Sequence, residues 1–96
     1  MEKSQIKRLE ATVYGRVQGV GFRAFTRQKA RAQEALTGWV KNQPDGTVKL
    51  VAEGPMNSLE NLLQAVQQGP LRARVENLDL DWLEPTGSYR EFSIKY

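Results

Sequence analysis

Cysteine is absent from this 96-residue chain. Disulfides, thiolate nucleophiles and sulfur-ligated metals are therefore excluded, and the absence suits a reducing compartment. No apolar run approaches the length that a bilayer-spanning helix needs. The charged segment 1–8 also lacks the apolar core of a signal peptide. These features predict a cytoplasmic protein that does not act on a membrane.

Histidine is absent as well. This excludes the side chain that most often transfers protons near neutral pH. Any catalysis must therefore use carboxylates, lysine or tyrosine with shifted pKa values, or positioning and electrostatics alone.

The short length predicts a single domain over residues 1–96, with no room for a separate cofactor-binding domain. We expect no cofactor. The net charge is +3, and residues 1–50 hold ten basic against four acidic side chains. This basic excess is typical of a protein that binds an anion, although a solvated surface of mixed charge would give the same count.

The most informative segment, Val13 to Arg23, joins a strand-like stretch to a helix through a glycine-rich bend. Glycines allow tight turns and a close backbone approach to a ligand, and the first N–H groups of a helix favour anions. The Arg23 guanidinium could grip phosphate oxygens in bidentate fashion. A plain strand-to-helix connection is the alternative. The N–H groups predicted to form the cradle belong to Gln18, Gly19, Val20, Gly21, Phe22 and Arg23; we expect Gln18 to contribute only its backbone.

Periodicity predicts two helices and four to five strands. A helix should begin at residue 22, with its apolar face formed by Phe22, Phe25, Ala32 and Leu36. A second should follow Gly54-Pro55, with an apolar stripe at Leu59, Leu62, Leu63 and Val66, and end at Gly69-Pro70. Strands are predicted at residues 9–14, 37–42, 48–52, 78–82 and 92–96, with a turn at residues 43–46.

The element order β-α-β-β-α-β predicts an α+β, ferredoxin-like sandwich: a mostly antiparallel sheet of four to five strands with both helices on one face. The first two strands should run parallel with the third between them, roughly 9.6 Å apart at twice the ~4.8 Å strand spacing. Arg23 follows the first strand and Asn42 closes the second. Both should therefore lie around one pocket that suits a phosphate.

Two motifs also resemble the acylphosphatase family. The stretch from Gly15 to Arg23 resembles its first signature, and Gly38-Trp39-Val40-Lys41-Asn42, with Gly46, Val48 and Gly54 after it, resembles its second. The resemblance covers the chain from about Leu9 to Tyr96. It implies the ferredoxin-like fold and hydrolysis of a small-molecule acyl phosphate. It also implies that Arg23 binds the phosphate and that Asn42 orients the attacking water.

The available side chains agree with that chemistry. An acyl phosphate releases a carboxylate, whose conjugate acid has a pKa near ~4, so no general acid is needed. The Asn42 amide can accept from a water but cannot ionise to act as a base. We therefore expect the bound phosphate to take the proton of the water, without a covalent intermediate or a metal. Inorganic phosphate should be product and inhibitor, and a monomer is the simplest state.

The main alternative is a non-catalytic ferredoxin-like module that binds a phosphate-bearing ligand or RNA. An RNA-binding sheet needs exposed aromatic residues on its central strands, and segment 47–52 has none. We therefore expect no nucleic-acid partner. The chain departs from the family at residues 33–37, where a glycine usually ends the first helix. The end of that helix is left open by the sequence, because Ala35 lacks glycine's freedom to adopt a positive φ.

Overall fold

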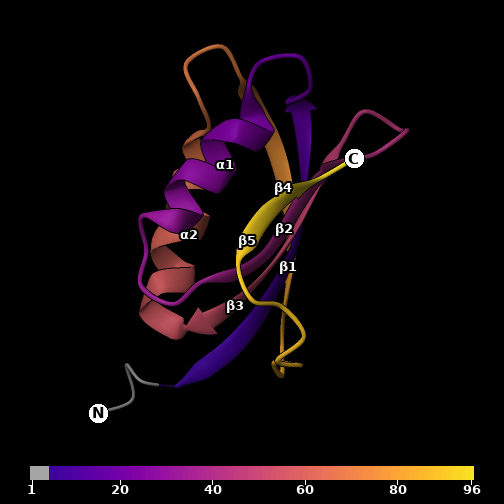
Figure 1. Ribbon diagram of the computed structural model, residues 1–96. Coiled ribbons are helices and arrows are strands. Elements are labelled where there is room, and N and C mark those ends of the chain that lie inside the picture. Colours follow the sequence, from indigo (N-terminus) through magenta and orange to yellow (C-terminus); the bar gives the residue numbers. More distant parts are fainter. Residues whose placement is uncertain (1–4) are drawn as a thin grey trace.

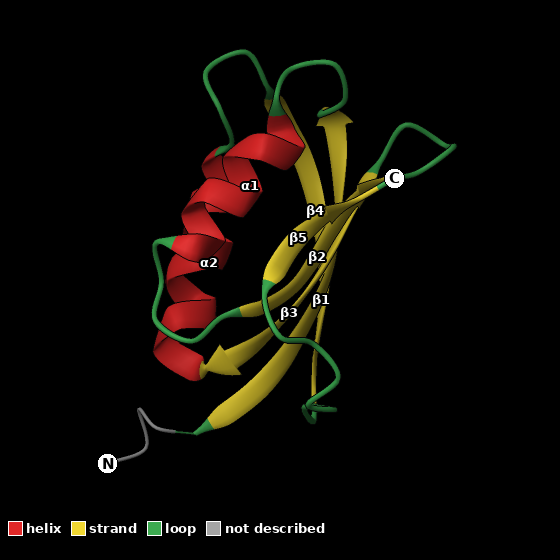
Figure 2. Ribbon diagram, in the orientation of Figure 1, coloured by secondary structure: helices red, strands yellow, loops and turns green. Residues whose placement is uncertain are grey.

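The computed structural model describes residues 5–96 of the chain. Residues 1–4, part of the segment in which we expect no signal peptide, lie outside the described residues. The elements are β1 (Ile6–Arg16), α1 (Phe22–Arg31), β2 (Thr37–Asn42), β3 (Val48–Pro55), α2 (Met56–Gln68), β4 (Arg74–Leu83) and β5 (Phe92–Lys95). Both helices cover the same face of the sheet (Figures 1 and 2). Neither helix has the length and hydrophobicity to cross a membrane.

The five strands form one sheet in the order β4-β1-β3-β2-β5. Strand β3 pairs antiparallel with both β1 and β2, and β4 pairs antiparallel with β1. The two strands of the first β-α-β unit are therefore parallel, with β3 between them. Among the described strands, β2 and β5 are the one pair hydrogen-bonded in parallel. The ferredoxin-like α+β prediction is confirmed.

Alternation along the strands separates a helix-covered face from an open one. Leu9, Ala11 and Val13 of β1 are fully or almost fully buried beneath the helices, as a period of two requires. Helix α2 covers them with the predicted stripe, of which Leu59, Leu62 and Val66 are fully buried. The core thus lies between the sheet and the helices.

The predicted apolar face of α1 is wrong in its second half. The helix ends at Arg31, so Leu36 is buried but lies beyond the helix, and Ala32 is exposed. The buried face is instead Phe22, Thr26 and Ala30, spaced four residues apart. A threonine can be buried here because its hydroxyl donates to the Phe22 carbonyl oxygen, 2.8 Å away.

The turn after α1 shows how the helix ends without the expected glycine. The Ala32 N–H donates to the Gln28 carbonyl oxygen, 3.1 Å away, in a last helical bond. Ala35 then adopts φ 61°, and it alone among the non-glycine residues described has a positive φ. Gly54 of β3 approaches this turn so closely that a Cβ there would lie 2.7 Å from the Ala35 carbonyl oxygen. The tertiary contact holds Ala35 in a conformation that its side chain disfavours.

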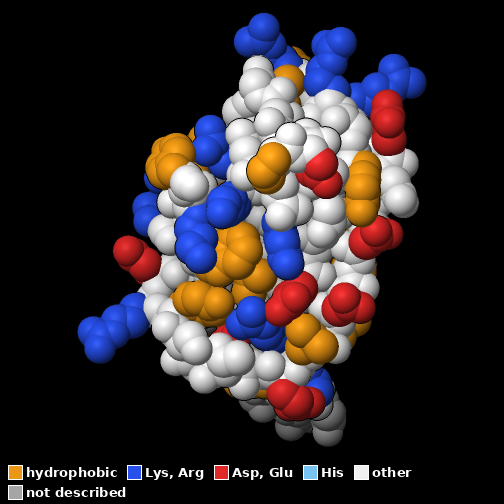
Figure 3. Space-filling view, turned by 90° about the vertical axis from the view of Figure 1, so that its right-hand side faces the viewer, with side chains coloured by type: hydrophobic (Ala, Val, Ile, Leu, Met, Phe, Trp, Pro, Cys, Tyr) orange, Lys and Arg blue, Asp and Glu red, His pale blue; other side chains and the backbone are white. Residues whose placement is uncertain are grey.

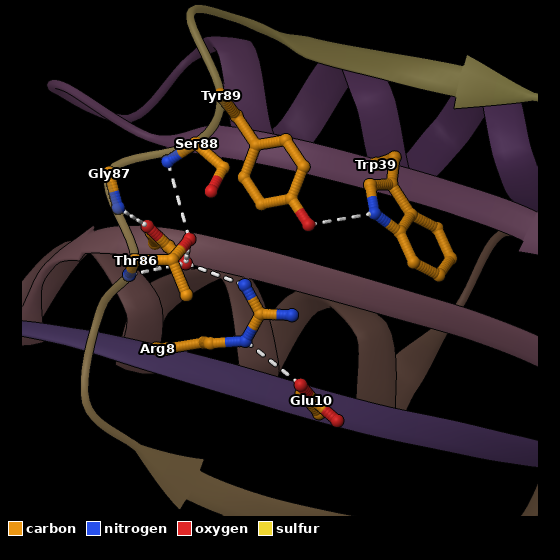
Figure 4. A network of polar contacts seen from close by, with 8 residues as sticks. Arg8, Glu10, Trp39, Thr86, Gly87, Ser88 and Tyr89 are labelled. Carbon is orange, nitrogen blue, oxygen red and sulfur yellow. Dashed lines mark hydrogen bonds and ion pairs between the residues drawn. The ribbon is translucent and has the colours of Figure 1, made fainter.

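The open face of the sheet carries side chains of both charges among hydrophobic ones (Figure 3). The connection 84–91 is fastened to this face by Glu53, which is only 4% exposed. The Glu53 carboxylate accepts from the N–H groups of Thr86 and Gly87, at 3.0 and 2.9 Å. It also accepts from the Arg8 guanidinium at 2.6 Å. This polar cluster stabilises the approach to β5 (Figure 4).

Candidate active site

A cavity of about 280 Å³ lies where the carboxyl ends of β1 and β2 meet the amino end of α1. The parallel arrangement of these strands places their ends at one edge of the sheet, as expected. The cavity is lined by Val17, Gly19, Gly21, Phe22, Arg23, Ala24, Arg27, Asn42, Ile94 and Tyr96. The two residues singled out from the sequence, Arg23 and Asn42, therefore share one concave site.

The amino end of α1 is built to hold an anion. Gly21 is its N-cap, in the left-handed conformation (φ 80°, ψ 20°), and no side chain caps the helix. No acidic residue lies in the first turn. The first N–H groups of the helix therefore keep their hydrogen-bonding capacity, and the positive end of the helix dipole is not neutralised. Gly19, at φ 73°, turns the preceding loop.

The predicted cradle is only partly exposed to the cavity. Gly19, Gly21, Phe22 and Arg23 line it, whereas Gln18 and Val20 do not. Val20 packs against the core, which directs its side chain away from a ligand. The loop therefore divides its residues between lining the site and anchoring the loop.

The side chain of Gln18 is more important than the sequence suggested. Its Nε2 donates to the carbonyl oxygens of Gln43 and Thr47, both 2.8 Å away. These bonds connect the loop before α1 to the turn that follows Asn42. The expectation that Gln18 contributes only its backbone is wrong, because the partners belong to a turn that is distant in sequence.

Arg23 is held by an aromatic ring rather than by a carboxylate. Its Cζ lies 5.0 Å from the ring centroid of Tyr96, within the range of a cation–π contact. Within residues 5–96 it forms no ion pair. The guanidinium thus keeps its charge and its hydrogen-bond donors for a ligand.

Asn42 ends β2, where it pairs with Val48 of β3. Its Oδ1 atom is buried, and among the described residues it is the one such side-chain atom without a hydrogen-bond partner. Buried polar atoms are nearly always paired, and an unpaired one costs about 1–3 kcal/mol. Asn42 is also one of the residues that line the cavity, so this acceptor without a partner lies next to the space that a water or a ligand donor would enter.

A larger hollow of about 530 Å³ lies on the open face of the sheet, against β1 and β4. Its lining includes Glu10, Asp79 and Asp81 with the single cation Lys49. Three carboxylates would repel a phosphate, so this hollow does not compete as the anion site. Within residues 5–96 no three such carboxylates are placed to hold a metal ion together.

Sequence reasoning missed Arg27 and the ring of Tyr96 as parts of the site. Arg27 follows Arg23 by four residues, and residues four apart share one side of a helix; this spacing was the signal that could have identified it. The place of Tyr96 depends on how β5 lies against α1, which no local pattern contains.

Comparison with known proteins gives a consistent result. The family model described as acylphosphatase matches residues 9–94. The chain is 50% identical to the acylphosphatase of Salinibacter ruber over 99% of each chain. It is 51% identical to that of Thermus thermophilus over 83% of this chain and 90% of the relative. The crystal structure of acylphosphatase from Bacillus subtilis matches with a TM-score of 0.89 and 39% identity, over 94% of this chain and 99% of that one.

Proposed function

The chain belongs to the acylphosphatase family and is an acylphosphatase, and we propose that Arg23 and Asn42 carry the hydrolysis. The substrate of such an enzyme is an acyl phosphate, and inorganic phosphate is a product. The observation that supports the residue assignment best is that Asn42, whose buried Oδ1 has no hydrogen-bond partner within residues 5–96, lines the same cavity as Arg23. One group is free to bind the phosphate and the other is free to hold a water.

The phosphate would bind at the amino end of α1. The first-turn N–H groups and the Arg23 guanidinium would bind its oxygens, since both present donors and positive charge without a competing carboxylate. Donors of this kind act on the transition state when they are already in place before reaction. Removing one such donor typically costs about 2.7–4 kcal/mol of barrier.

The attacking water would donate one hydrogen bond to the Asn42 Oδ1, which aligns its lone pair with the phosphorus atom. As the new P–O bond forms, the bond from phosphorus to the acyl oxygen breaks and its electron pair leaves with the carboxylate. A phosphate oxygen takes the proton that the water loses, so the products are the carboxylate and inorganic phosphate. No protein side chain is phosphorylated in this route.

This arrangement favours acyl phosphates over ordinary phosphate esters. An ester releases an alkoxide that needs a general acid, and the chain has no histidine to supply one. A carboxylate leaves unaided near neutral pH because its conjugate acid has a pKa near ~4. The alternative of a non-catalytic phosphate- or RNA-binding module is disfavoured by the family membership.

The test is hydrolysis of benzoyl phosphate in the presence of a chelator. Arg23→Gln and Asn42→Ala should each lower kcat/KM by about 10²–10³-fold, the usual effect of losing a preorganised donor or positioning group. Arg16→Gln is the matched control, because Arg16 is an exposed arginine at the end of β1 that does not line the cavity. Parental rates in either site variant would remove that residue from the mechanism.

The remaining expectations stay predictions. We propose that one domain over residues 1–96 acts as a cytoplasmic monomer without a metal. Undiminished turnover in chelator and a single 10.9 kDa species on sedimentation would support the metal-free and monomeric parts. Trapping a phosphorylated side chain during turnover would contradict direct attack by water.

A further inference from the structure

We propose that Arg27 recognises a second anionic group on the acyl part of the substrate, so that the preferred substrates are acyl phosphates whose acyl chain is itself charged. The inference rests on the proposed function of Arg23 and the amino end of α1. It assigns a ligand contact to a residue that the hydrolytic reaction does not need.

Three arginines on one flank of α1 lie along β5. Arg31 donates from Nε to the Phe92 carbonyl oxygen at 3.0 Å, where β5 begins. Arg23 stacks on the ring of Tyr96, just after β5 ends. Four helical residues rise about 6 Å and two strand residues about 6.6 Å. Every fourth residue of α1 therefore lies beside every second residue of β5. Arg27 therefore faces the middle of β5, where Ile94 lines the cavity with it.

Within residues 5–96, Arg27 differs from Arg23 and Arg31 in having no protein partner. Arg31 has the Phe92 carbonyl oxygen and a contact of 3.9 Å with the Glu91 carboxylate, and Arg23 has the Tyr96 ring. Across residues 5–96, Arg27 forms neither a side-chain hydrogen bond nor an ion pair, although it is half-buried in the cavity wall. A guanidinium in that position is best satisfied by an anion that enters the cavity.

That anion is not the reacting phosphate. The phosphate is expected at the amino end of α1, against the first-turn N–H groups and Arg23. Arg27 lies one turn further along the helix, about 6 Å away along its axis. An acyl chain bound in this cavity would extend from the phosphate past Ala24 and Ile94, which also line it. A chain with two methylene groups and a terminal carboxylate would present its charge to Arg27 over this distance.

The test compares two substrates of equal chain length, succinyl phosphate and butyryl phosphate. Arg27→Ala should lower kcat/KM for succinyl phosphate about 10- to 100-fold, the effect of losing one charge-assisted hydrogen-bonding partner. It should lower kcat/KM for butyryl phosphate less than about 3-fold. Arg27→Lys should retain part of the preference, because it keeps the charge but not the planar fork.

The matched control is Lys29→Ala, which removes one positive charge from the same helix outside the cavity. Lys29 is exposed and its Nζ lies 5.5 Å from the Phe25 ring centroid. Neither substrate should be affected. Binding of non-hydrolysable keto-phosphonate analogues, with and without the terminal carboxylate, provides a second readout by calorimetry; only the carboxylate form should lose affinity in Arg27→Ala.

The outcomes separate this inference from the proposed function. If the parent hydrolyses both substrates and Arg27→Ala lowers both equally, or lowers neither, the assignment of Arg27 to the acyl chain is wrong while the hydrolytic site stands. If Arg23→Gln leaves both rates unchanged, the site itself has been misassigned and the inference fails with it. If Lys29→Ala lowered kcat/KM for succinyl phosphate as much as Arg27→Ala, the effect would come from the overall positive charge of the helix, and a specific contact with Arg27 would be contradicted.

Discussion

The side-chain amide of Gln18 donates a hydrogen bond of 2.8 Å to the carbonyl oxygen of Gln43. This bond joins the anion-binding loop to the turn directly after Asn42. A second bond of 2.8 Å to the Thr47 carbonyl oxygen fixes the same contact at the other side of the turn. In addition to the sheet pairing through β3, one side chain thus links the two halves of the site directly.

Gln18→Ala should therefore impair catalysis more than folding. The loss of two hydrogen bonds should lower the free energy of unfolding by about 1–2 kcal/mol, while the looser site should lower kcat/KM for benzoyl phosphate about 10-fold or more. Urea titration and steady-state kinetics measure the two effects. The control is Gln43→Ala, whose Nε2 bonds only Thr47 Oγ1 within the turn. A parental kcat/KM in Gln18→Ala would show that the tether has no catalytic role.

Ala35 offers a site where one substitution should stabilise the protein. Its φ of 61° costs an alanine about 1–2 kcal/mol that glycine does not incur. Glycine also makes the unfolded chain more flexible, which offsets part of the stability gained by removing this strain. Ala35→Gly should raise the free energy of unfolding by about 0.5–1 kcal/mol. Thermal and urea unfolding would measure the gain.

The control for this prediction is Ala32→Gly, three residues earlier. Ala32 has φ −78° and a right-handed conformation, so glycine there gains nothing and should destabilise by about 0.5–1 kcal/mol. If Ala35→Gly also destabilised the protein, the positive φ would not be a source of strain.

Glu53 should make stability depend on acid pH. Burial alone would raise the pKa of Glu53, but the Thr86 N–H, the Arg8 guanidinium and the Gly87 N–H outweigh it and lower the pKa from 4.5 to about 2. Because the folded pKa is the lower one, the stabilisation is complete above the unfolded value and is lost as pH falls toward about 2. A shift of this size corresponds to about 3 kcal/mol.

The free energy of unfolding should therefore fall by about 2 kcal/mol from this group alone between pH 7 and pH 3. Glu53→Gln should be several kcal/mol less stable at neutral pH, since it leaves Arg8 without its buried partner, and its deficit should shrink in acid. The control is Glu10→Gln, which removes the other carboxylate bonded to Arg8, at 2.8 Å. Because Glu53 is intact in this variant, its free energy of unfolding should still fall as the pH is lowered. Urea titrations from pH 7 to pH 3 measure these free energies of unfolding. If the difference between the parent and Glu53→Gln did not change with pH, the lowered pKa of Glu53 would be contradicted.

Local patterns in the sequence contained most of the fold. The alternation at Leu9, Ala11 and Val13 and the stripe on α2 match the buried faces found. Asn42 ends β2 as predicted, and the alternation that buries Val40 places Asn42 on the same side of the strand. These features could be predicted because periodicity and turn residues act over a few neighbouring residues.

The end of α1 could not be predicted in this way. Local spacing favoured an apolar face continuing through Ala32 to Leu36, but the helix stops at Arg31. The close approach of Gly54 from β3 determines the turn there. A contact between residues far apart in sequence outweighed the local preference.

By itself, the sequence determined the order of the elements, the inward faces and the two chain segments that carry Arg23 and Asn42. The tertiary structure alone decided that Asn42 Oδ1 is buried without a partner among residues 5–96, that Gln18 bridges two motifs and that Arg27 lines the same cavity as Ile94 of β5. The physical reason is that hydrophobic periodicity specifies which side of an element is buried. The convergence of side chains from separate elements depends instead on how those elements pack, because hydrogen bonds and charge contacts act only over a few ångströms.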